Sequence, residues 1–261
     1  MCGRYRLTQA ERFAELNNLE FRDGLPADEF SDVRLGGRWK SPRYNICPDS
    51  YVAAVLDTDP RSIVPLRWGL VPPWSPSPKR EAATINVRAE TVSKAPSFRA
   101  AWKKRRCLIP ADGLYEWKKI TEKQKQPYDI SMRGGEPFAF AGLWEIWWPK
   151  DAPEGTPPLR TCTIITAEPN ELVAQIHNRQ AVILPRERYA AWLSPDTSEA
   201  DRLAMLEPYP SEGMTAHPIS TRVNKPGDDD PTLIEEVPPA TAFPTRPQKA
   251  KADDAQGDLF G

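Results

Sequence analysis

The chain of 261 residues has 39% hydrophobic content, enough to bury the core of one large domain or two small ones. It lacks the apolar segment of a signal peptide and any run of roughly 18 apolar residues, so we expect a soluble cytosolic protein without a membrane partner. The net charge is −1, but it is unevenly divided: eight acidic and three basic residues follow Gly227, so the end of the chain carries −5 and the body carries +4. The positive charge of the body permits a nucleic-acid surface without requiring one.

Short sequence patterns predict the order of the elements. T-Q-A-E at Thr8–Glu11 has the pattern of a capping box and predicts a short helix after a first strand. Gly142 in the run F-A-F-A-G-L-W-E-I-W indicates a bend or bulge. Helices are expected at Ser97–Lys104 and Pro185–Leu193, and strands at Tyr51–Leu56, Ile63–Trp68, Arg106–Ile109, Gly113–Lys118, Tyr128–Met132, Phe138–Trp147 and Thr161–Thr166. Many short strands with few helices indicate an α+β domain that is β-rich, with a strongly curved or barrel-like sheet.

The end of the chain differs in composition from the body. Residues 231–261 are rich in Pro, Ala, Asp and Lys and poor in aromatic and β-branched residues, a composition that cannot offset the entropy of ordering. We therefore expect one domain over residues 1–230, a disordered acidic tail over residues 231–261, and a monomer as the default state.

The four cysteines do not form a metal or disulfide framework. Cys2, Cys47, Cys107 and Cys162 are far apart, contain no C-x-x-C pair and share the chain with only two histidines. No metal or other cofactor is expected, and the inner three cysteines are expected to be small buried residues.

Cys2 differs because it follows the initiator methionine. Aminopeptidases trim Met before a small residue, and a terminal Cys2 would carry an α-amine of pKa about 8 beside a thiol of pKa about 8.5. This 1,2-aminothiol attacks aldehydes, because the amine forms an imine and the thiolate closes it into a thiazolidine. Alternatively, Cys2 is only a small residue that permits Met1 removal, and its position alone does not decide.

Two further stretches carry polar residues suited to chemistry. In T-I-N-V-R-A-E-T, Asn86 and Arg88 share a face if the stretch is extended, and they suit a backbone carbonyl and a phosphate. The alternative is a turn asparagine with a solvated arginine. In D-G-L-Y-E-W, burial of Glu116 beside Trp117 would raise its pKa toward that of a general acid or base, whereas on an edge strand it would face water.

One histidine and two tryptophans complete the candidates. His177, two positions before Arg179 in I-H-N-R, is the side chain suited to proton transfer near neutral pH, although a lone histidine is more often structural. Trp68 and Trp74 lie in the Pro-rich stretch W-G-L-V-P-P-W-S, and tryptophan interleaved with arginine is typical of single-stranded nucleic-acid surfaces. Core packing is the alternative for either ring.

Taken together, these stretches resemble one family. M-C-G-R-Y, P-R-Y-N-I-C-P, R-W-G-L-V-P-P-W, I-N-V-R-A-E-T, C-L-I-P-A-D-G-L-Y-E-W, I-I-T, H-N-R and H-P-I-S-T-R-V-N occur in the order seen in the SRAP family, the SOS response-associated peptidases. The similarity runs from residue 2 to about residue 226. It implies a largely antiparallel β-core with peripheral helices and a positively charged channel, and makes residues 1–230 an SRAP domain.

The resemblance also implies an activity and a site. Family members recognise abasic sites in single-stranded DNA and trap the ring-opened sugar aldehyde in a thiazolidine, which shields the lesion during the DNA damage response. Accordingly, Cys2 would be the crosslinking nucleophile after removal of Met1, by the protein itself as a cysteine peptidase or by another enzyme. Asn86 would hold the N-terminal residue, Glu116 would transfer protons, and His177 would promote opening of the deoxyribose ring. The residues implied to contact DNA are Arg4, Asn45, Pro48, Trp68, Arg88, Trp117, Thr166 and Arg179.

The sequence also departs from the family. Gln180 and Ala181 follow Arg179 where Met-Pro is common, and Cys47 stands where a smaller residue is usual, so a second thiol is expected near the site. The tail contains Q-G-D-L-F at Gln256–Phe260, and its residues Gln256, Leu259 and Phe260 resemble peptides that dock on the bacterial sliding clamp. This predicts a replication-fork partner, and a chance match is the alternative.

Two rival functions remain at this stage. Glutamine amidotransferases with an N-terminal cysteine also begin Met-Cys-Gly, but they use an Asn-Gly pair in the oxyanion hole, and the chain contains none. A non-covalent reader of modified DNA would leave the M-C-G start and Glu116 without a purpose.

Overall fold

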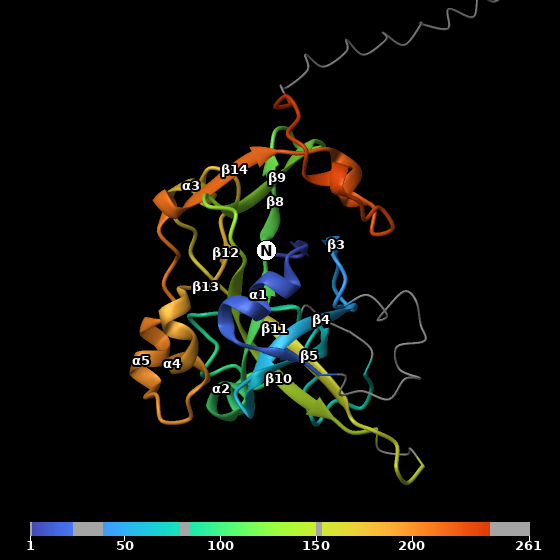
Figure 1. Ribbon diagram of the computed structural model, residues 1–261, viewed down its shortest axis with the longest axis vertical. Helices are drawn as coiled ribbons and strands as arrows, with labels where there is room; N and C mark the ends of the chain where they lie inside the picture. Colours follow the sequence, from blue (N-terminus) through green and yellow to red (C-terminus); the bar gives the residue numbers. More distant parts are fainter. Residues whose placement is uncertain (1, 23–38, 79–83, 150–152, 241–261) are drawn as a thin grey trace, which may run out of the picture.

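A computed structural model describes residues 2–22, 39–78, 84–149 and 153–240. The chain forms two sheets with short helices around them (Figure 1). The larger sheet contains a closed barrel, and the smaller one carries the first strand of the chain. In Figure 1 the N-terminus lies at the centre of the molecule, where the two sheets meet.

The barrel consists of five strands that pair around a closed path. β4 (Tyr51–Leu56), β5 (Asp59–Trp68), β11 (Leu159–Ala167), β10 (Phe138–Trp147) and β7 (Arg106–Ala111) follow one another, and β7 returns to β4. Only the β5–β11 pair within this circle is parallel. Every residue of β4 and β7 is buried, because one face fills the barrel and the other is covered.

Short strands extend the barrel at its edges. β2 (Glu20–Phe21) pairs in parallel with β5, and β6 (Asn86–Arg88) pairs in parallel with the end of β11. β12 (Gln180–Ala181) joins β11, and β13 (Ile183–Leu184) joins β10. The edge formed by β6, β11 and β12 therefore brings together segments that are almost a hundred residues apart in the chain.

The second sheet is antiparallel and has five strands. Its order is β14 (Met214–Pro218), β9 (Lys125–Met132), β8 (Gly113–Lys119), β1 (Tyr5–Leu7) and β3 (Arg43–Ile46). Because β1 lies between β8 and β3, the residues before it run out beside the middle of the sheet. The N-terminus is thus held by tertiary structure.

Helices cover the outside of the sheets. α1 (Ala10–Asn17), α2 (Arg99–Lys104), α3 (Glu171–Ala174), α4 (Tyr189–Leu193) and α5 (Glu199–Ala204) are short, and the 3-10 helices are η2 (Arg186–Arg188), η3 (Ser211–Gly213), η4 (Thr221–Asn224) and η5 (Pro231–Ile234). Buried Arg106 in β7 joins α2 to α4: its Nη1 donates to the Lys103 carbonyl at 3.2 Å, and its Nε and Nη2 donate to the carbonyls of Trp192 and Ser194 at 2.8 and 3.0 Å. None of the helices that the structure describes is long and apolar enough to cross a membrane.

The sequence-based fold class is confirmed, and two local predictions are wrong. The capping box at Thr8–Glu11 does not form: α1 begins after Gln9 without a side-chain cap, and the Thr8 hydroxyl instead donates to Asp112 at 3.0 Å. The predicted bulge at Gly142 is absent from the β7–β10 ladder, whose register is continuous. Gly142 is needed because a Cβ there would lie 2.8 Å from the Cys107 sulfur.

An ionic cluster at 10% side-chain exposure or less joins β1 to β8 and β9. Arg6 Nε and Nη2 donate to both carboxylate oxygens of Asp129, at 2.9 and 3.1 Å, and its Nη1 donates to Asp112 at 2.5 Å. The second oxygen of Asp112 accepts the backbone N–H groups of Thr8 and Gln9. This cluster fixes the direction in which the chain leaves the sheet toward the N-terminus.

Ordered structure continues past the predicted domain boundary at residue 230. Leu233 in η5 is fully buried, the Val237 N–H donates to the Pro218 carbonyl at 2.9 Å, and the Ala240 N–H donates to Gln126 at 3.2 Å. Residues 231–240 therefore belong to the folded body, because their few apolar side chains have a place to pack. The rest of the predicted tail, residues 241–261, lies outside the described residues.

Candidate functional site

The site is built around Cys2, which is completely buried. Its thiol lies 3.9 Å from the carbonyl of Arg4. Burial raises the pKa of this thiol well above its ordinary value, and the charge of Glu116 raises it further. The sulfur is therefore a neutral thiol in this state, and its reaction as a nucleophile requires a neighbouring group that accepts the proton. Met1 lies outside the described residues.

Asn86 fixes the backbone of Cys2. β6 places its side chain beside the N-terminus, where Nδ2 donates to the Cys2 carbonyl at 2.7 Å. The Asn86 side chain is buried, and its Oδ1 has no hydrogen-bond partner among the described residues. An amide donor aimed at the carbonyl of residue 2 holds that residue in one orientation.

Glu116 in β8 is a buried carboxyl group, 1% exposed. Burial raises its pKa to about 7. The alternative, an edge-strand position facing water, is not found, since β8 is paired on both sides, with β1 and β9. A carboxyl group with this pKa can both donate and accept a proton near neutral pH.

His177 lies next to Glu116, following α3. Its Nδ1 is 3.7 Å from Glu116 Oε2 and accepts a hydrogen bond from the Arg179 N–H at 3.1 Å. Partial burial lowers the pKa of the imidazole below its ordinary value, so the ring is neutral at neutral pH. His177 and Glu116 thus lie side by side, and the charge of Glu116 acts on the Cys2 thiol.

The loop that carries His177 is held by the residue that departs from the family pattern. Gln180 Oε1 accepts the Asn170 N–H at 2.9 Å, and Asn170 Oδ1 caps α3 by accepting the Val173 N–H at 2.9 Å. The His177 N–H then donates to the Val173 carbonyl at 2.8 Å. The Gln180 side chain thus links this loop to the start of α3.

Some of the residues expected to contact DNA are exposed or half-buried. Arg88 is exposed at the end of β6, and Pro48 is half-buried in the turn after β3. Trp117 is half-buried, and its indole N–H donates to Asn224 Oδ1 at 2.8 Å. Arg179 exposes 13% of its side chain and binds Glu90 and the Thr166 carbonyl.

Three other members of that expected set are buried in this structure. Trp68 is 0% exposed, donates to the Ile85 carbonyl at 2.9 Å and packs edge-on against Tyr5, so no base can stack on it. The Asn45 side-chain amide donates hydrogen bonds to the carbonyls of Val223, Lys225 and Asp228. The Thr166 hydroxyl donates to the Val87 carbonyl at 3.3 Å. These side chains support the site from within.

The Arg4 side chain also forms hydrogen bonds within the folded body. Its guanidinium donates to Asn45 Oδ1 at 2.8 Å and to the carbonyls of Val223 and Asn224 in η4. The side chain therefore ties the segment after Cys2 to the C-terminal part of the body. Cys47, opposite Arg4 at the end of β3, is half-buried, unlike the fully buried Cys107 and Cys162.

Sequence reasoning missed part of the exposed aromatic surface. Trp74, named from its loop, is 62% exposed, but Trp148 at the end of β10 is 60% exposed and had no distinguishing pattern. The Trp147 indole donates to the Ser75 carbonyl at 2.9 Å, which brings the two segments together. A run of W-W at a strand end could have indicated one ring inside and one outside.

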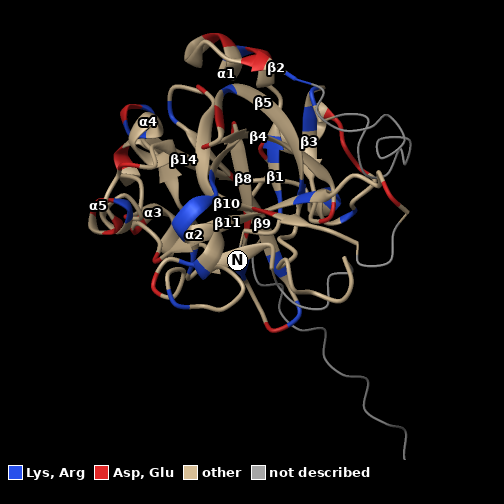
Figure 2. Cartoon of the chain, turned by 90° about the horizontal axis from the view of Figure 1, so that it is seen from below, with Lys and Arg blue, Asp and Glu red and all other residues tan. Residues whose placement is uncertain are grey.

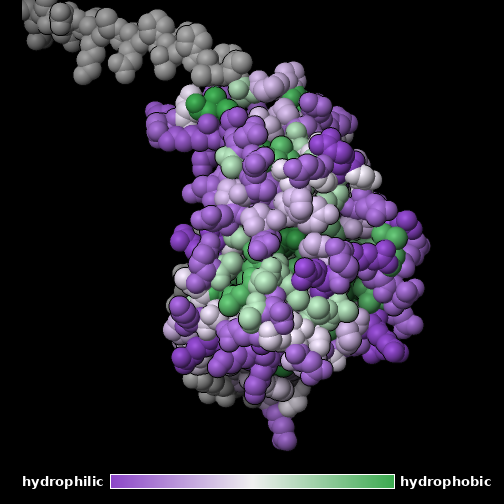
Figure 3. Space-filling model, turned by 90° about the vertical axis from the view of Figure 1, so that its left-hand side faces the viewer, coloured by the Kyte–Doolittle hydropathy of each residue, from purple (hydrophilic) through white to green (hydrophobic). Residues whose placement is uncertain are grey.

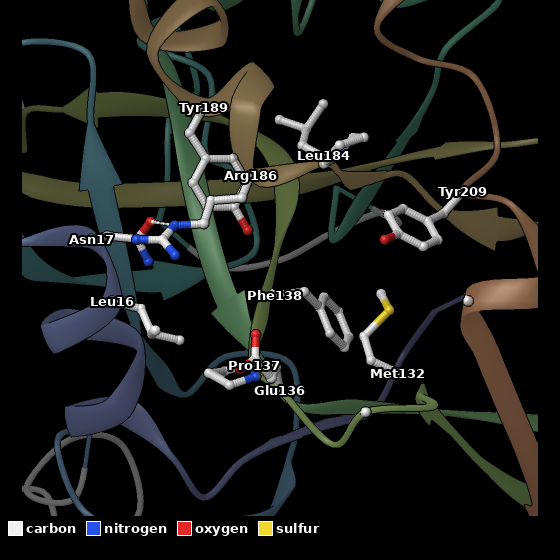
Figure 4. Close-up of a pocket in the computed structure, with 13 residues that line it drawn as sticks. Leu16, Asn17, Met132, Glu136, Pro137, Phe138, Leu184, Arg186, Tyr189 and Tyr209 are labelled. Carbon is white, nitrogen blue, oxygen red and sulfur yellow. Dashed lines mark hydrogen bonds between the residues drawn. The ribbon is translucent and has the colours of Figure 1, made fainter.

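Two hollows differ in their relation to the site. A hollow of about 570 Å³, which we call the Trp117 hollow, is lined by Trp117, Glu122, Lys123, Gln124, Lys125, Thr221 and Asn224. Its aromatic wall and lysines suit a nucleotide. A hollow of about 320 Å³ between α1 and η2 is lined by Phe138, Met132, Tyr209 and their neighbours, and none of the candidate site residues lines it (Figure 4).

The surface of the molecule is mixed in character. In Figure 3 apolar side chains gather in the middle of the visible face and are bordered by hydrophilic residues. In Figure 2 basic and acidic residues are interspersed over the helices and strands. Positive charge at the site is thus local, from residues such as Arg88 and Lys125. Within the described part of the chain, no group of His, Cys, Asp and Glu side chains could hold a metal ion.

Comparison with known proteins agrees with this geometry. The family model of the SOS response associated peptidases, SRAP, matches residues 1–226. The chain belongs to the SRAP family. A solved structure of a protein from Bacteroides thetaiotaomicron shares the SRAP fold seen here, with a TM-score of 0.75 at 27% identity, covering 90% of this chain and all of that one.

Relatives of this SRAP protein carry informative names. The abasic site processing protein YoqW of Bacillus subtilis is 41% identical over 238 residues, 90% of this chain and 99% of that protein. The abasic site processing protein HMCES of Gallus gallus is 34% identical over 76% of this chain and 67% of that protein. The abasic site processing protein YedK of Escherichia coli is 28% identical over 91% of this chain and all of that protein.

Proposed function

We propose that this protein recognises abasic sites in single-stranded DNA and captures them covalently through Cys2, shielding the lesion in the DNA damage response. The observation that carries the proposal is the position of Cys2, which Asn86 holds by its carbonyl beside the Glu116–His177 pair. The relatives named as abasic site processing proteins support the substrate.

The first step exposes the amine of Cys2. Hydrolysis of the Met1–Cys2 peptide bond adds hydroxide to the acyl carbon of Met1 and a proton to the leaving nitrogen. Glu116, with a pKa of about 7, is suited to take the proton from the attacking group and return it to that nitrogen. Asn86 keeps the Cys2 carbonyl in place throughout. The peptidase activity in the family's description agrees with this step.

The second step forms the thiazolidine. His177 assists opening of the deoxyribose ring by moving a proton between the C1′ hydroxyl and the ring oxygen, which frees the aldehyde. The α-amine of Cys2 adds to the aldehyde, and Glu116 gives a proton to the hydroxyl of the resulting carbinolamine, which leaves as water and produces a protonated imine. The thiol of Cys2 then returns a proton to the Glu116 carboxylate as its sulfur adds to the imine carbon, and this closes the ring with a neutral nitrogen. No oxidant or reductant is required.

The DNA strand would lie over the surface beside this pair. Arg88 and Arg179 are positioned to bind backbone phosphates, and Trp117 and its hollow can accommodate a flanking base. Pro48 lies in the turn after β3, two residues beyond Ile46, which pairs with Tyr5. Arg4, Asn45, Trp68 and Thr166 act in this scheme as supports of the interface.

The experiment is denaturing electrophoresis of the protein after incubation with single-stranded DNA that contains one abasic site. Wild type is expected to form a stable adduct, Cys2→Ala none, and Cys47→Ala as much as wild type. Intact mass should show that Met1 is absent from the wild type and retained in Glu116→Gln if removal is autocatalytic. An undiminished adduct from Cys2→Ala refutes the proposal, and glutaminase activity would support the amidotransferase alternative.

We further propose that the C-terminal Q-G-D-L-F peptide tethers the protein to the sliding clamp at replication forks. Gln256, Leu259 and Phe260 lie outside the described residues, so the support is the sequence pattern alone. A tether of this length would raise the local concentration of the crosslinking domain on newly exposed single strands. Equal retention of wild type and a Leu259→Ala, Phe260→Ala variant on immobilised clamp would refute this proposal.

A further inference from the structure

Arg179 is paired with a carboxylate that the proposed reaction does not use. Its Nη1 and Nη2 donate to the two oxygens of Glu90, at 2.7 and 3.1 Å, in a two-pronged pair. Nη2 also donates to the Thr166 carbonyl at 2.6 Å. Glu90 lies just after β6, where the Ala89 N–H donates to the Thr166 carbonyl at 2.8 Å. Both partners are thus positioned by the same residue of β11.

The Arg179 and Glu90 side chains differ in how easily they can move. The Arg179 side chain is 13% exposed and is anchored to β11, whereas the Glu90 side chain is 49% exposed. Arg179 lowers the pKa of the Glu90 carboxyl group through these hydrogen bonds, so the carboxylate is ionised at neutral pH. Glu90 can leave the pair by rotating into solvent, whereas Arg179 has to break its bond to Thr166 to move.

A carboxylate and a phosphate present the same pair of oxygens to an arginine fork. We propose that Glu90 is a latch: in the DNA-free protein it occupies the fork of Arg179 that a backbone phosphate takes when the strand binds. This inference rests on the proposed function and deepens it by adding a residue that controls non-covalent binding. Glu90 itself is a gating residue that acts through Arg179.

The latch has a consequence for the search for lesions. Any strand that enters the site must displace the carboxylate, so binding to undamaged DNA is weakened. At an abasic site the covalent bond to Cys2 holds the strand, and the weakening no longer limits capture. The latch therefore shortens the time that the protein stays bound to undamaged strands, and it does not prevent the capture of damaged ones.

The test compares the affinity of wild type and Glu90→Gln for undamaged oligothymidine by fluorescence anisotropy at several salt concentrations. Glu90→Gln is expected to bind about three- to ten-fold more tightly at low salt, because the competing anion is gone. The slope of log affinity against log salt should steepen by about 0.7, the contribution of one phosphate contact on a single strand. Glu168→Gln removes an exposed carboxylate two residues after Thr166 and serves as the matched control, with a smaller change expected.

A double-mutant comparison shows whether Glu90 acts through Arg179. The gain from Glu90→Gln should disappear in an Arg179→Gln background. An equal gain there, or a gain from Glu168→Gln as large as that from Glu90→Gln, shows a general charge effect and overturns the latch. Weaker binding by Glu90→Gln also overturns it. Adduct formation by the wild type is assayed in parallel. If the wild type forms an adduct but Glu90→Gln binds undamaged DNA no more tightly than wild type, only the latch is overturned. If the wild type forms no adduct, the proposed function is overturned.

Discussion

At the scale of single residues, Glu116 has two properties that oppose each other. Its burial in β8 destabilises the ionised form, and the same burial brings its pKa to about 7, where the carboxyl group can exchange protons with the N-terminal residue. A glutamic acid in water would be fully ionised at neutral pH and could not act as an acid there. The reactivity that we propose therefore requires a local loss of stability.

This loss predicts a pH-dependent effect of Glu116→Gln on stability. Because the folded-state pKa lies above the ordinary 4.5, the folded protein retains a proton that the unfolded chain releases, and stability falls as pH rises from 4.5 to about 7. The neutral amide avoids this loss. The variant should exceed wild type in free energy of unfolding by up to roughly 3 kcal/mol at pH 8 and by little at pH 4.5.

Urea unfolding at the two pH values checks this prediction. Glu122→Gln is the control, because the Glu122 side chain is 87% exposed and its change should be small at both pH values. A difference between Glu116→Gln and wild type that is the same at pH 4.5 and pH 8 would show that the carboxyl group does not titrate in this range.

At the scale of elements, the first strand is fixed by Gly113 as much as by Arg6. A Cβ on Gly113 would lie 2.4 Å from Arg6 Nε and 2.6 Å from its Cζ, so the guanidinium can reach Asp129 and Asp112 only because residue 113 has no side chain. Displacing Arg6 would leave two buried carboxylates without their cation. The junction between β1 and β8 is therefore sensitive to a single methyl group.

We expect Gly113→Ala to lower the free energy of unfolding by about 3 to 5 kcal/mol, the range for breaking a buried ion pair. Gly134→Ala is the matched control, since a Cβ there meets nothing within 4 Å. Urea titration of both variants at neutral pH provides the measurement. If the two substitutions have equal effects, the Arg6 cluster does not hold the strand.

The same elements show what sequence reasoning can reach. β4 and β10 were predicted to the residue, because alternating aromatic, β-branched and small side chains mark strands wherever they pack. The capping box failed because Asp112, far along the chain, binds the N–H groups of Thr8 and Gln9. A local pattern cannot show a competing partner that only the tertiary fold supplies.

Some features of the candidate site could also be predicted from the sequence, and others could not. Family motifs pointed to Cys2, Asn86 and Glu116, and the fold places Asn86 against Cys2 with Glu116 beside them. Burial could not be foreseen for Trp68, because its motif does not show which side of the sheet the ring faces. The pairing of Glu90 with Arg179 depends on β6 meeting β11, a contact between distant segments that sequence spacing does not reveal.

At the scale of the whole molecule, the C-terminal segment holds the end of the chain that carries Cys2. Asp229 accepts the backbone N–H groups of Tyr44 and Asn45 in β3, and the Asp228 carbonyl accepts the Asn45 amide at 2.8 Å. Asp230 pairs with Arg222 and begins η5. The acidic run that composition analysis assigned to the end of the chain therefore has a structural role in its first three residues.

This arrangement predicts different effects of two truncations. Removing residues 241–261 should leave the free energy of unfolding within about 0.5 kcal/mol of the full chain. Removing residues 227–261, beyond the end of the family match, takes away buried Leu233 and the Asp229 bonds to β3, and should lower it by about 3 to 5 kcal/mol. Because Asn45 also binds Arg4, the shorter protein should form its Cys2 adduct more slowly. Urea unfolding and adduct electrophoresis of both truncations provide the measurements, and equal stabilities would mean that residues 227–240 do not support the site.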